Sequence, residues 1–182
     1  MDWENGAQIL EYLKENFSAG VVTGASNDRN FAAATRTYFG TVPEAVRKAD
    51  LIYSKSGRVT KAMVEDPRNV GILYSCNAEF LQQIADKVYF GARYGKRRTL
   101  DQGDLVSEGF MRFLEVLPDK PPKEGIRKFT YWPVRKALLD QNREMFGKEA
   151  TFGEEVYFDL FRADKPDEDF EFESDDPFFQ NS

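Results

Sequence analysis

The sequence predicts an all-α protein, a compact helical bundle that is followed by an acidic C-terminal tail. Apolar residues recur at helical spacing in several segments, and no segment shows the strict alternation of a half-buried strand. Helix-start signals and prolines separate these segments. After Gly147 the periodicity stops and the chain becomes acidic, so we expect three parts: an N-terminal helical segment of unassigned role (1–76), a helical domain (77–148) and the tail (149–182).

The N-terminal part is expected to open with a helix at residues 7–17, because Ile9, Leu13 and Phe17 fall on one face. The stretch that follows, at residues 18–30, is rich in Gly, Ser, Asn and Asp and predicts a loop.

Local signals bound the next helices. Thr41 is a favoured N-cap residue, with Pro43 in the first turn and Glu44 placed to close a capping box. Asp66 followed by Pro67 should end or kink the segment before it.

Two helices with a continuous apolar stripe are predicted in the middle of the chain, at residues 77–90 and 104–117. Thr99 and Gln102 are expected to form a capping box ahead of the second helix. The stripe of that second helix consists of Leu105, Val106, Gly109, Phe110, Phe113, Leu114 and Leu117.

A further helix is predicted from about residue 129 to residue 146. Pro133 should lie in its first turn, where a missing N–H group has no partner to lose. Residues 149–182 are acidic, aperiodic and contain proline, which is typical of a segment that is disordered in isolation.

Composition argues for a binding protein rather than an enzyme. The chain has no histidine, which excludes histidine triads, histidine-ligated zinc and histidine acid–base catalysis. Cys76 is the single cysteine, so neither an intramolecular disulfide nor a cysteine metal cluster is expected. Neither phosphate-binding glycine motif occurs, and no pair of carboxylates stands out from the charged surface. We therefore expect no catalytic residue, no metal and no cofactor.

No apolar stretch approaches the roughly 20 residues that a membrane span needs, and no basic-then-apolar leader opens the chain. The expectation is a cytoplasmic protein without a membrane partner.

Charge is distributed unevenly along the chain. Residues 1–90 carry 10 Lys and Arg against 11 Asp and Glu, residues 91–148 carry 13 against 8, and residues 149–182 carry 2 against 12. A basic middle beside an acidic tail is typical of a surface that faces nucleic acid, joined to a tail that binds a partner or masks that surface. The alternative is a solvated helical surface with a disordered tail.

The polar residues of the predicted helix 104–117 follow a recognisable order, D-L-V-x-E-x-F-x-R. This order resembles region 2 of the bacterial sigma factors, the promoter-specificity subunits of RNA polymerase. The helix before it, the basic connection and the P-x-K-E-G turn occur in matching order. The segment F-T-Y-W-P-V-R-K-A is similar to the F-x-x-W-x-x-x-x-A of the small extracytoplasmic-function sigma factors.

The resemblance covers residues 77 to about 146, and three features depart from it. The long DNA-melting segment of housekeeping sigma factors is shortened, Pro133 replaces an apolar residue, and no C-terminal helix-turn-helix for the promoter −35 element is found. A region 2 without that reader, with an acidic aromatic tail, is similar to the late-gene sigma factor of T4-type phages. A phage-encoded protein is therefore expected.

The resemblance implies that the helix with this motif binds the clamp helices of the largest subunit of the RNA polymerase core. Asp104, Glu108 and Arg112 would be polar contacts, with Leu105 and Phe110 near the seam. The other interpretation of these residues is an ordinary solvated helix face.

The resemblance also implies that the following helix meets single-stranded promoter DNA of the −10 region. Phe129, Tyr131 and Trp132 offer flat faces on which unpaired bases can stack. The basic residues expected against phosphates are Arg135, Lys136 and Arg143. The alternative is that these aromatic residues belong to the core, and at least one of them is expected to be buried.

Two tail segments are similar to partner-binding peptides. Y-F-D-L-F resembles the Q-L-[SD]-L-F peptide that docks in bacterial sliding clamps, although it lacks the glutamine, and D-D-P-F-F-Q-N-S resembles the acidic aromatic tips of clamp- and polymerase-binding tails. Apolar anchors of this kind fill a partner's pocket. The candidate contact residues are Phe158, Leu160, Phe161, Phe178 and Phe179.

The expected function is therefore that of a compact sigma factor, which binds core RNA polymerase and recognises and opens a −10-like promoter. Three alternatives stay open at this stage. One is a sigma mimic that inhibits or redirects host polymerase, and another is a replication accessory whose acidic tail recruits partners. The third is a purely structural helical protein.

Overall fold

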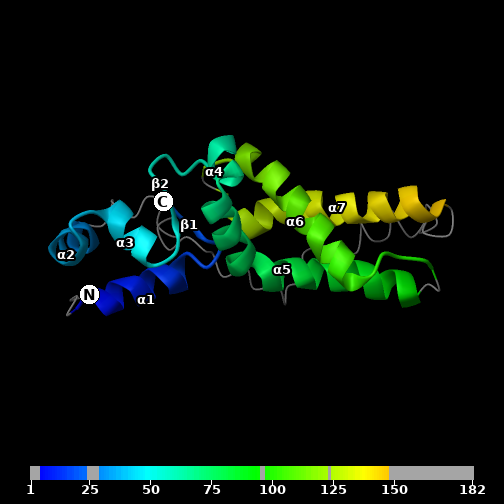
Figure 1. Ribbon diagram of the computed structural model, residues 1–182, viewed down its shortest axis with the longest axis horizontal. Helices are drawn as coiled ribbons and strands as arrows, with labels where there is room; N and C mark the ends of the chain where they lie inside the picture. Colours follow the sequence, from blue (N-terminus) through cyan, green and yellow to red (C-terminus); the bar gives the residue numbers. More distant parts are fainter. Residues whose placement is uncertain (1–4, 24–28, 95–96, 123, 148–182) are drawn as a thin grey trace.

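The computed structural model describes residues 5–23, 29–94, 97–122 and 124–147, and over these ranges the protein is elongated and mainly helical (Figure 1). The predicted all-α class is confirmed; the predicted disordered tail lies outside the described residues. The elements in chain order are α1 (Gly6–Asn16), β1 (Val21–Thr23), α2 (Arg29–Phe39), α3 (Val42–Lys48), β2 (Ile52–Ser54), α4 (Lys61–Glu65), α5 (Pro67–Tyr94), α6 (Gln102–Val116), a 3-10 turn (Leu117–Asp119) and α7 (Ile126–Phe146).

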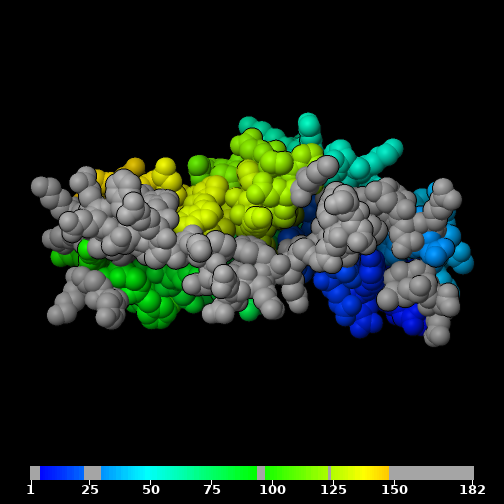
Figure 2. Space-filling model, turned by 180° about the vertical axis from the view of Figure 1, so that it is seen from behind, coloured from blue at the N-terminus to red at the C-terminus, as the bar shows by residue number. Residues whose placement is uncertain are grey.

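Two groups of elements occupy the two ends of the molecule. The helices α1, α2 and α3 gather at one end, and α5, α6 and α7 form a three-helix bundle that extends to the other end (Figures 1 and 2). The helices α1, α2 and α3 share one cluster of buried apolar side chains, and the bundle has another, which also includes Ala19, Val21 and Ile52. Cys76 packs against both clusters. We call the first group, residues 5–54, the N-terminal unit.

The N-terminal unit contains two strands that periodicity did not predict. β1 and β2 pair in parallel, with Val21 opposite Ile52, and each has only three residues. The prediction of a loop at residues 18–30 is therefore wrong for β1 and for the start of α2. Strands of three residues are too short for an alternation that a sequence pattern can detect.

Local capping signals position the short helices of this part. Thr41 is the N-cap of α3, and its side chain accepts a hydrogen bond from the N–H of Glu44 as predicted. The Glu44 carboxylate turns instead toward Arg47, with 3.4 Å between the charged atoms. Asp66 and Pro67 separate α4 from α5 as predicted, with proline at the first helical position.

The bundle is held by the apolar stripe predicted for α6. Leu105, Phe113 and Leu117 are completely buried among residues of α5 and α7. The capping prediction ahead of α6 is wrong, because Asp101 is the N-cap and accepts from the N–H of Asp104. Thr99 instead accepts a hydrogen bond from the buried Asn142 of α7 at 2.9 Å.

The helix α7 begins three residues earlier than predicted, at Ile126, and this changes the place of Pro133. The proline lies inside the helix rather than in its first turn. It therefore removes an internal hydrogen bond to the carbonyl of Phe129, and its ring crowds that carbonyl, at a cost of about 3 kcal/mol relative to an ordinary residue.

Arg127, in the first turn of α7, links the N-terminal unit to the helical bundle. Its guanidinium group donates to the carbonyl oxygens of Ser18 and Cys76, at 3.2 and 3.0 Å, and to the side-chain oxygen of Asn77. The buried Asn77 in turn donates to the carbonyl of Ala19 at 3.1 Å. We call this arrangement the Arg127 junction.

The helix α5 runs without a break through residues 76 and 77, where the sequence places a domain boundary, and that boundary stays a prediction. Among the described residues, no helix has the length and apolar character needed to cross a bilayer.

Candidate functional site

The exposed face of α6 carries the polar residues of the sequence motif. Asp104, Glu108 and Arg112 are exposed and lie one turn apart, because residues four positions apart share a helix face. Arg112 pairs with Glu115 at 2.8 Å, which fixes the direction of its guanidinium group. These three side chains are thus available to a partner.

The two apolar residues predicted beside this face have different environments. Leu105 is completely buried and positions α6 from within the bundle, so it offers no surface to a partner. Phe110 is half-buried and packs edge-to-face against Tyr74 of α5, with 5.0 Å between ring centroids. Tyr74 is 44% exposed and Met111 is 58% exposed, so an apolar rim borders the polar face of α6.

The three aromatic residues of α7 also differ in exposure. Phe129 is half-buried. Tyr131 is half-buried as well; it packs against the core, 6.4 Å from the Phe80 ring, and the ammonium group of Lys87 lies 5.7 Å from its centroid. Trp132 is 40% exposed, which leaves much of its ring accessible for stacking.

Arg135 holds the exposed ring in place. Its guanidinium carbon lies 5.4 Å from the centre of the Trp132 ring, and its Nη1 donates to the hydroxyl of Tyr131 at 3.4 Å. Tyr131 and Trp132 meet edge-to-face at 5.3 Å. The other two predicted basic residues, Lys136 and Arg143, are exposed.

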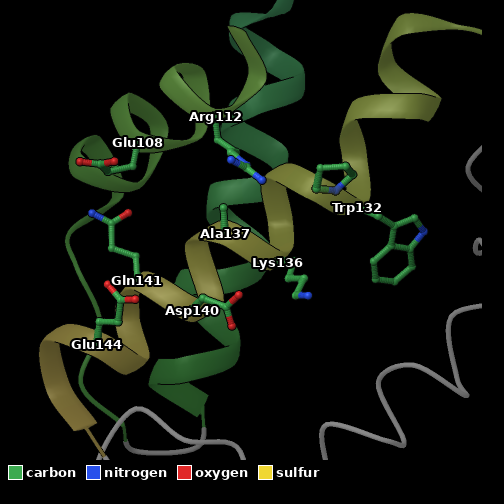
Figure 3. Close-up of a pocket in the computed structure, with 9 residues that line it drawn as sticks. Glu108, Arg112, Trp132, Lys136, Ala137, Asp140, Gln141 and Glu144 are labelled. Atoms are coloured by element: carbon green, nitrogen blue, oxygen red, sulfur yellow. The ribbon is translucent and has the colours of Figure 1, made fainter. Parts of the chain in front are cut away.

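A groove of about 780 Å³ between α6 and α7 brings the two predicted surfaces together (Figure 3). From α6 it is lined by two residues of the polar face, Glu108 and Arg112. From α7 it is lined by residues that recur almost every turn: Trp132, Pro133, Lys136, Ala137, Asp140, Gln141 and Glu144.

The groove has two chemically different ends. Trp132 lies at one end, and Glu108, Gln141 and Glu144 lie at the other, while Arg112 extends from α6 toward the middle (Figure 3). A ligand that stacks on the indole ring is therefore offered cations near the ring and carboxylates farther away.

Sequence reasoning missed the acidic residues that α7 contributes to this groove. Asp140 and Glu144 follow Trp132 and Lys136 at intervals of four residues, which places all four on one face of α7. Extending the spacing of four from Trp132 along the helix would have found them.

The described residues hold no group of three or more His, Cys, Asp or Glu side chains with a metal-binding arrangement. Burial raises the pKa of the Cys76 thiol, while a hydrogen bond with Ser75 and the charge of Arg127 oppose that rise. The thiol is therefore protonated at neutral pH, and it is not activated as a nucleophile.

The candidate tail contacts Phe158, Leu160, Phe161, Phe178 and Phe179 lie outside the described residues. Comparison with protein-family models, with curated proteins and with solved structures finds no match for this chain.

Proposed function

We propose that this protein is a compact sigma-like factor, which binds a multisubunit RNA polymerase core through α6 and single-stranded promoter DNA through α7. The observation that carries the proposal is the groove between these helices. It places Glu108 and Arg112 of the sequence motif on the same surface as Trp132 and Lys136. The two contacts proposed for this factor therefore border one groove.

The polymerase contact rests on the exposed polar face of α6 and its apolar rim. Asp104 and Glu108 offer two carboxylates one helical turn apart, and Phe110 with Tyr74 offers apolar area beside them. A polar face beside an aromatic patch is suited to a helical partner that has basic and apolar residues, such as the clamp helices of the polymerase.

The DNA contact rests on Trp132 and on the cations around it. An unpaired base that stacks on an aromatic ring gains roughly 1–3 kcal/mol, and Lys136 and Arg143 are exposed for phosphate contacts. Because duplex DNA hides its bases, this binding favours the melted promoter and shifts the equilibrium from the closed to the open complex.

The first test is a pull-down of purified core RNA polymerase, from a bacterial host and from phage sources, with the full-length protein. The double variant Asp104→Lys with Glu108→Lys should lose binding. The matched control is Glu11→Lys with Glu15→Lys, which reverses two exposed carboxylates with the same spacing on α1 and should bind normally. Absence of wild-type binding to every core, or equal binding by both variants, would refute the docking surface.

The second test measures binding of a fluorescent oligo-dT strand. Trp132→Ala should weaken binding roughly tenfold, since it removes one stacking platform. Phe90→Ala, which removes another exposed aromatic ring on α5, should have no effect. Equal affinities of these two variants would contradict the role of Trp132. A promoter-opening assay of the wild type and of Trp132→Ala then separates the two kinds of factor. An initiator opens the promoter and loses this activity in the variant, whereas a polymerase inhibitor blocks opening with or without the ring.

A further inference from the structure

The N-terminal unit contains a helix-turn-helix that the proposed function does not use. α2 and α3 are joined by Gly40 and Thr41 alone, and Gly40 has a φ of 79°, a left-handed conformation that favours glycine. Figure 1 shows α2 almost end-on while α3 lies in the plane of the page, so the two helix axes cross. Two crossing helices joined by a tight glycine turn resemble the helix-turn-helix, whose second helix can enter the major groove of DNA.

The inner side of α3 is fixed to the rest of the unit. Val42, Ala45 and Val46 are buried in one cluster with Phe31 of α2 and Leu13 of α1. The helix is therefore held rigidly by its inner face, which leaves its outer face available to a partner.

The outer side of α3 is basic. Arg47 and Lys48 are exposed on it, and residues 36–58 carry five Lys and Arg against two Asp and Glu. The two acidic side chains face cations: Glu44 lies 3.4 Å from Arg47, and Asp50 lies 4.0 Å from Arg68. The outer side of α3 therefore suits a polyanion. Arg36, Lys55 and Arg58 lie outside α3 in the same stretch of sequence; they are exposed and add positive charge to this part of the chain.

We propose that α3 binds double-stranded DNA by entering the major groove, with the surrounding cations on the phosphates. The major groove of B-form DNA admits an α-helix, whereas the deep and narrow major groove of duplex RNA does not. This activity goes beyond the proposed function and does not require polymerase. It gives the chain a duplex contact at one end and a single-strand contact, at Trp132, toward the other.

The test is a fluorescence-anisotropy titration of the full-length protein with a mixed-sequence duplex, at several salt concentrations, with oligo-dT as the second probe. Arg47→Gln with Lys48→Gln should weaken duplex binding tenfold or more and reduce the salt-dependence slope by about 2, since two phosphate contacts are lost. The same variant should keep its affinity for oligo-dT. Both side chains are exposed, and circular dichroism checks that the variant is folded.

The matched control is Lys14→Gln with Lys61→Gln, which removes the same charge from exposed positions outside residues 36–58. It should bind the duplex like the wild type, and so should Trp132→Ala. The proposal is overturned if the wild type does not bind duplex DNA at low salt. It is also overturned if the two double variants weaken binding equally, because the effect is then one of net charge alone.

Discussion

The helices α6 and α7 lie side by side in the bundle, yet they bury very different faces. α6 buries a broad apolar stripe that includes Leu105, Val106 and Phe113. α7 buries one residue in every four, and two members of this narrow row, Thr130 and Asn142, are polar. The side chain of Asp101 caps the N-terminal end of α6, whereas α7 has no side-chain cap and contains a proline.

The difference shows how two neighbouring helices divide the burial of side chains unequally. The broad stripe of α6 packs against residues of both α5 and α7, whereas α7 buries only a narrow row. The remaining surface of α7 is free for Trp132, Lys136 and Asp140, which line the groove. Four substitutions test this division, from the largest expected effect to the smallest.

Phe113→Ala in α6 should lower the free energy of unfolding by about 3–5 kcal/mol, because the ring is completely buried and its removal leaves a cavity. Urea denaturation measures the loss. Met111→Ala on the exposed face of the same helix is the control, and it should change stability by less than about 0.5 kcal/mol. A small effect of Phe113→Ala would show that the stripe of α6 contributes little to stability.

Pro133→Ala in α7 should raise the free energy of unfolding by up to about 3 kcal/mol, because alanine restores the hydrogen bond to Phe129 and relieves the crowding of its carbonyl. Thermal unfolding measures the gain. If stability falls instead, the proline is better accommodated in α7 than its place inside the helix indicates.

Asn142→Ala should destabilise the protein by about 2 kcal/mol. The side chain accepts from the N–H of Leu100 at 3.0 Å and donates to Thr99, so its removal leaves these partly buried groups without that partner. Met145→Ala, at an exposed position one turn away, should be neutral. Equal stabilities of these two variants in urea would show that the buried amide contributes nothing.

Gly109→Ala in α6 should stabilise the protein by about 1 kcal/mol, because alanine is the better helix former. An added Cβ would meet Val134 at 3.5 Å and Leu138 at 3.6 Å, which is ordinary contact. A loss of stability in a melting experiment would mean that α6 and α7 pack more tightly than these distances indicate.

The same contrast explains which elements the sequence could predict. α6 has a regular apolar stripe, so its burial followed from spacing alone. The row of α7 contains Thr130 and Asn142, which no hydropathy pattern assigns to a core, and its start was therefore misplaced by three residues. The helix α2 also buries a polar residue that hydropathy does not assign to a core. Thr35 is completely buried there, and its hydroxyl group donates a hydrogen bond to the carbonyl of Phe31.

Tertiary contacts decided the cap of α6 and the composition of the groove. Thr99 and Asp101 are both good capping residues. In the structure Thr99 accepts from Asn142, and Asp101 caps α6. The sequence motif placed Glu108 and Trp132 on two separate helices. Their meeting in one groove depends on how α6 and α7 pack, which local sequence does not specify.

The Arg127 junction has a consequence for local opening of the fold. If the N-terminal unit separates from the bundle, the guanidinium group loses the carbonyl acceptor of Ser18, and Asn77 loses that of Ala19. Opening at either side is therefore coupled to opening at the other. We expect the backbone amides of β1 and those of the second turn of α7 to exchange with deuterium at similar protection factors. Arg127→Met should lower the protection of both segments together.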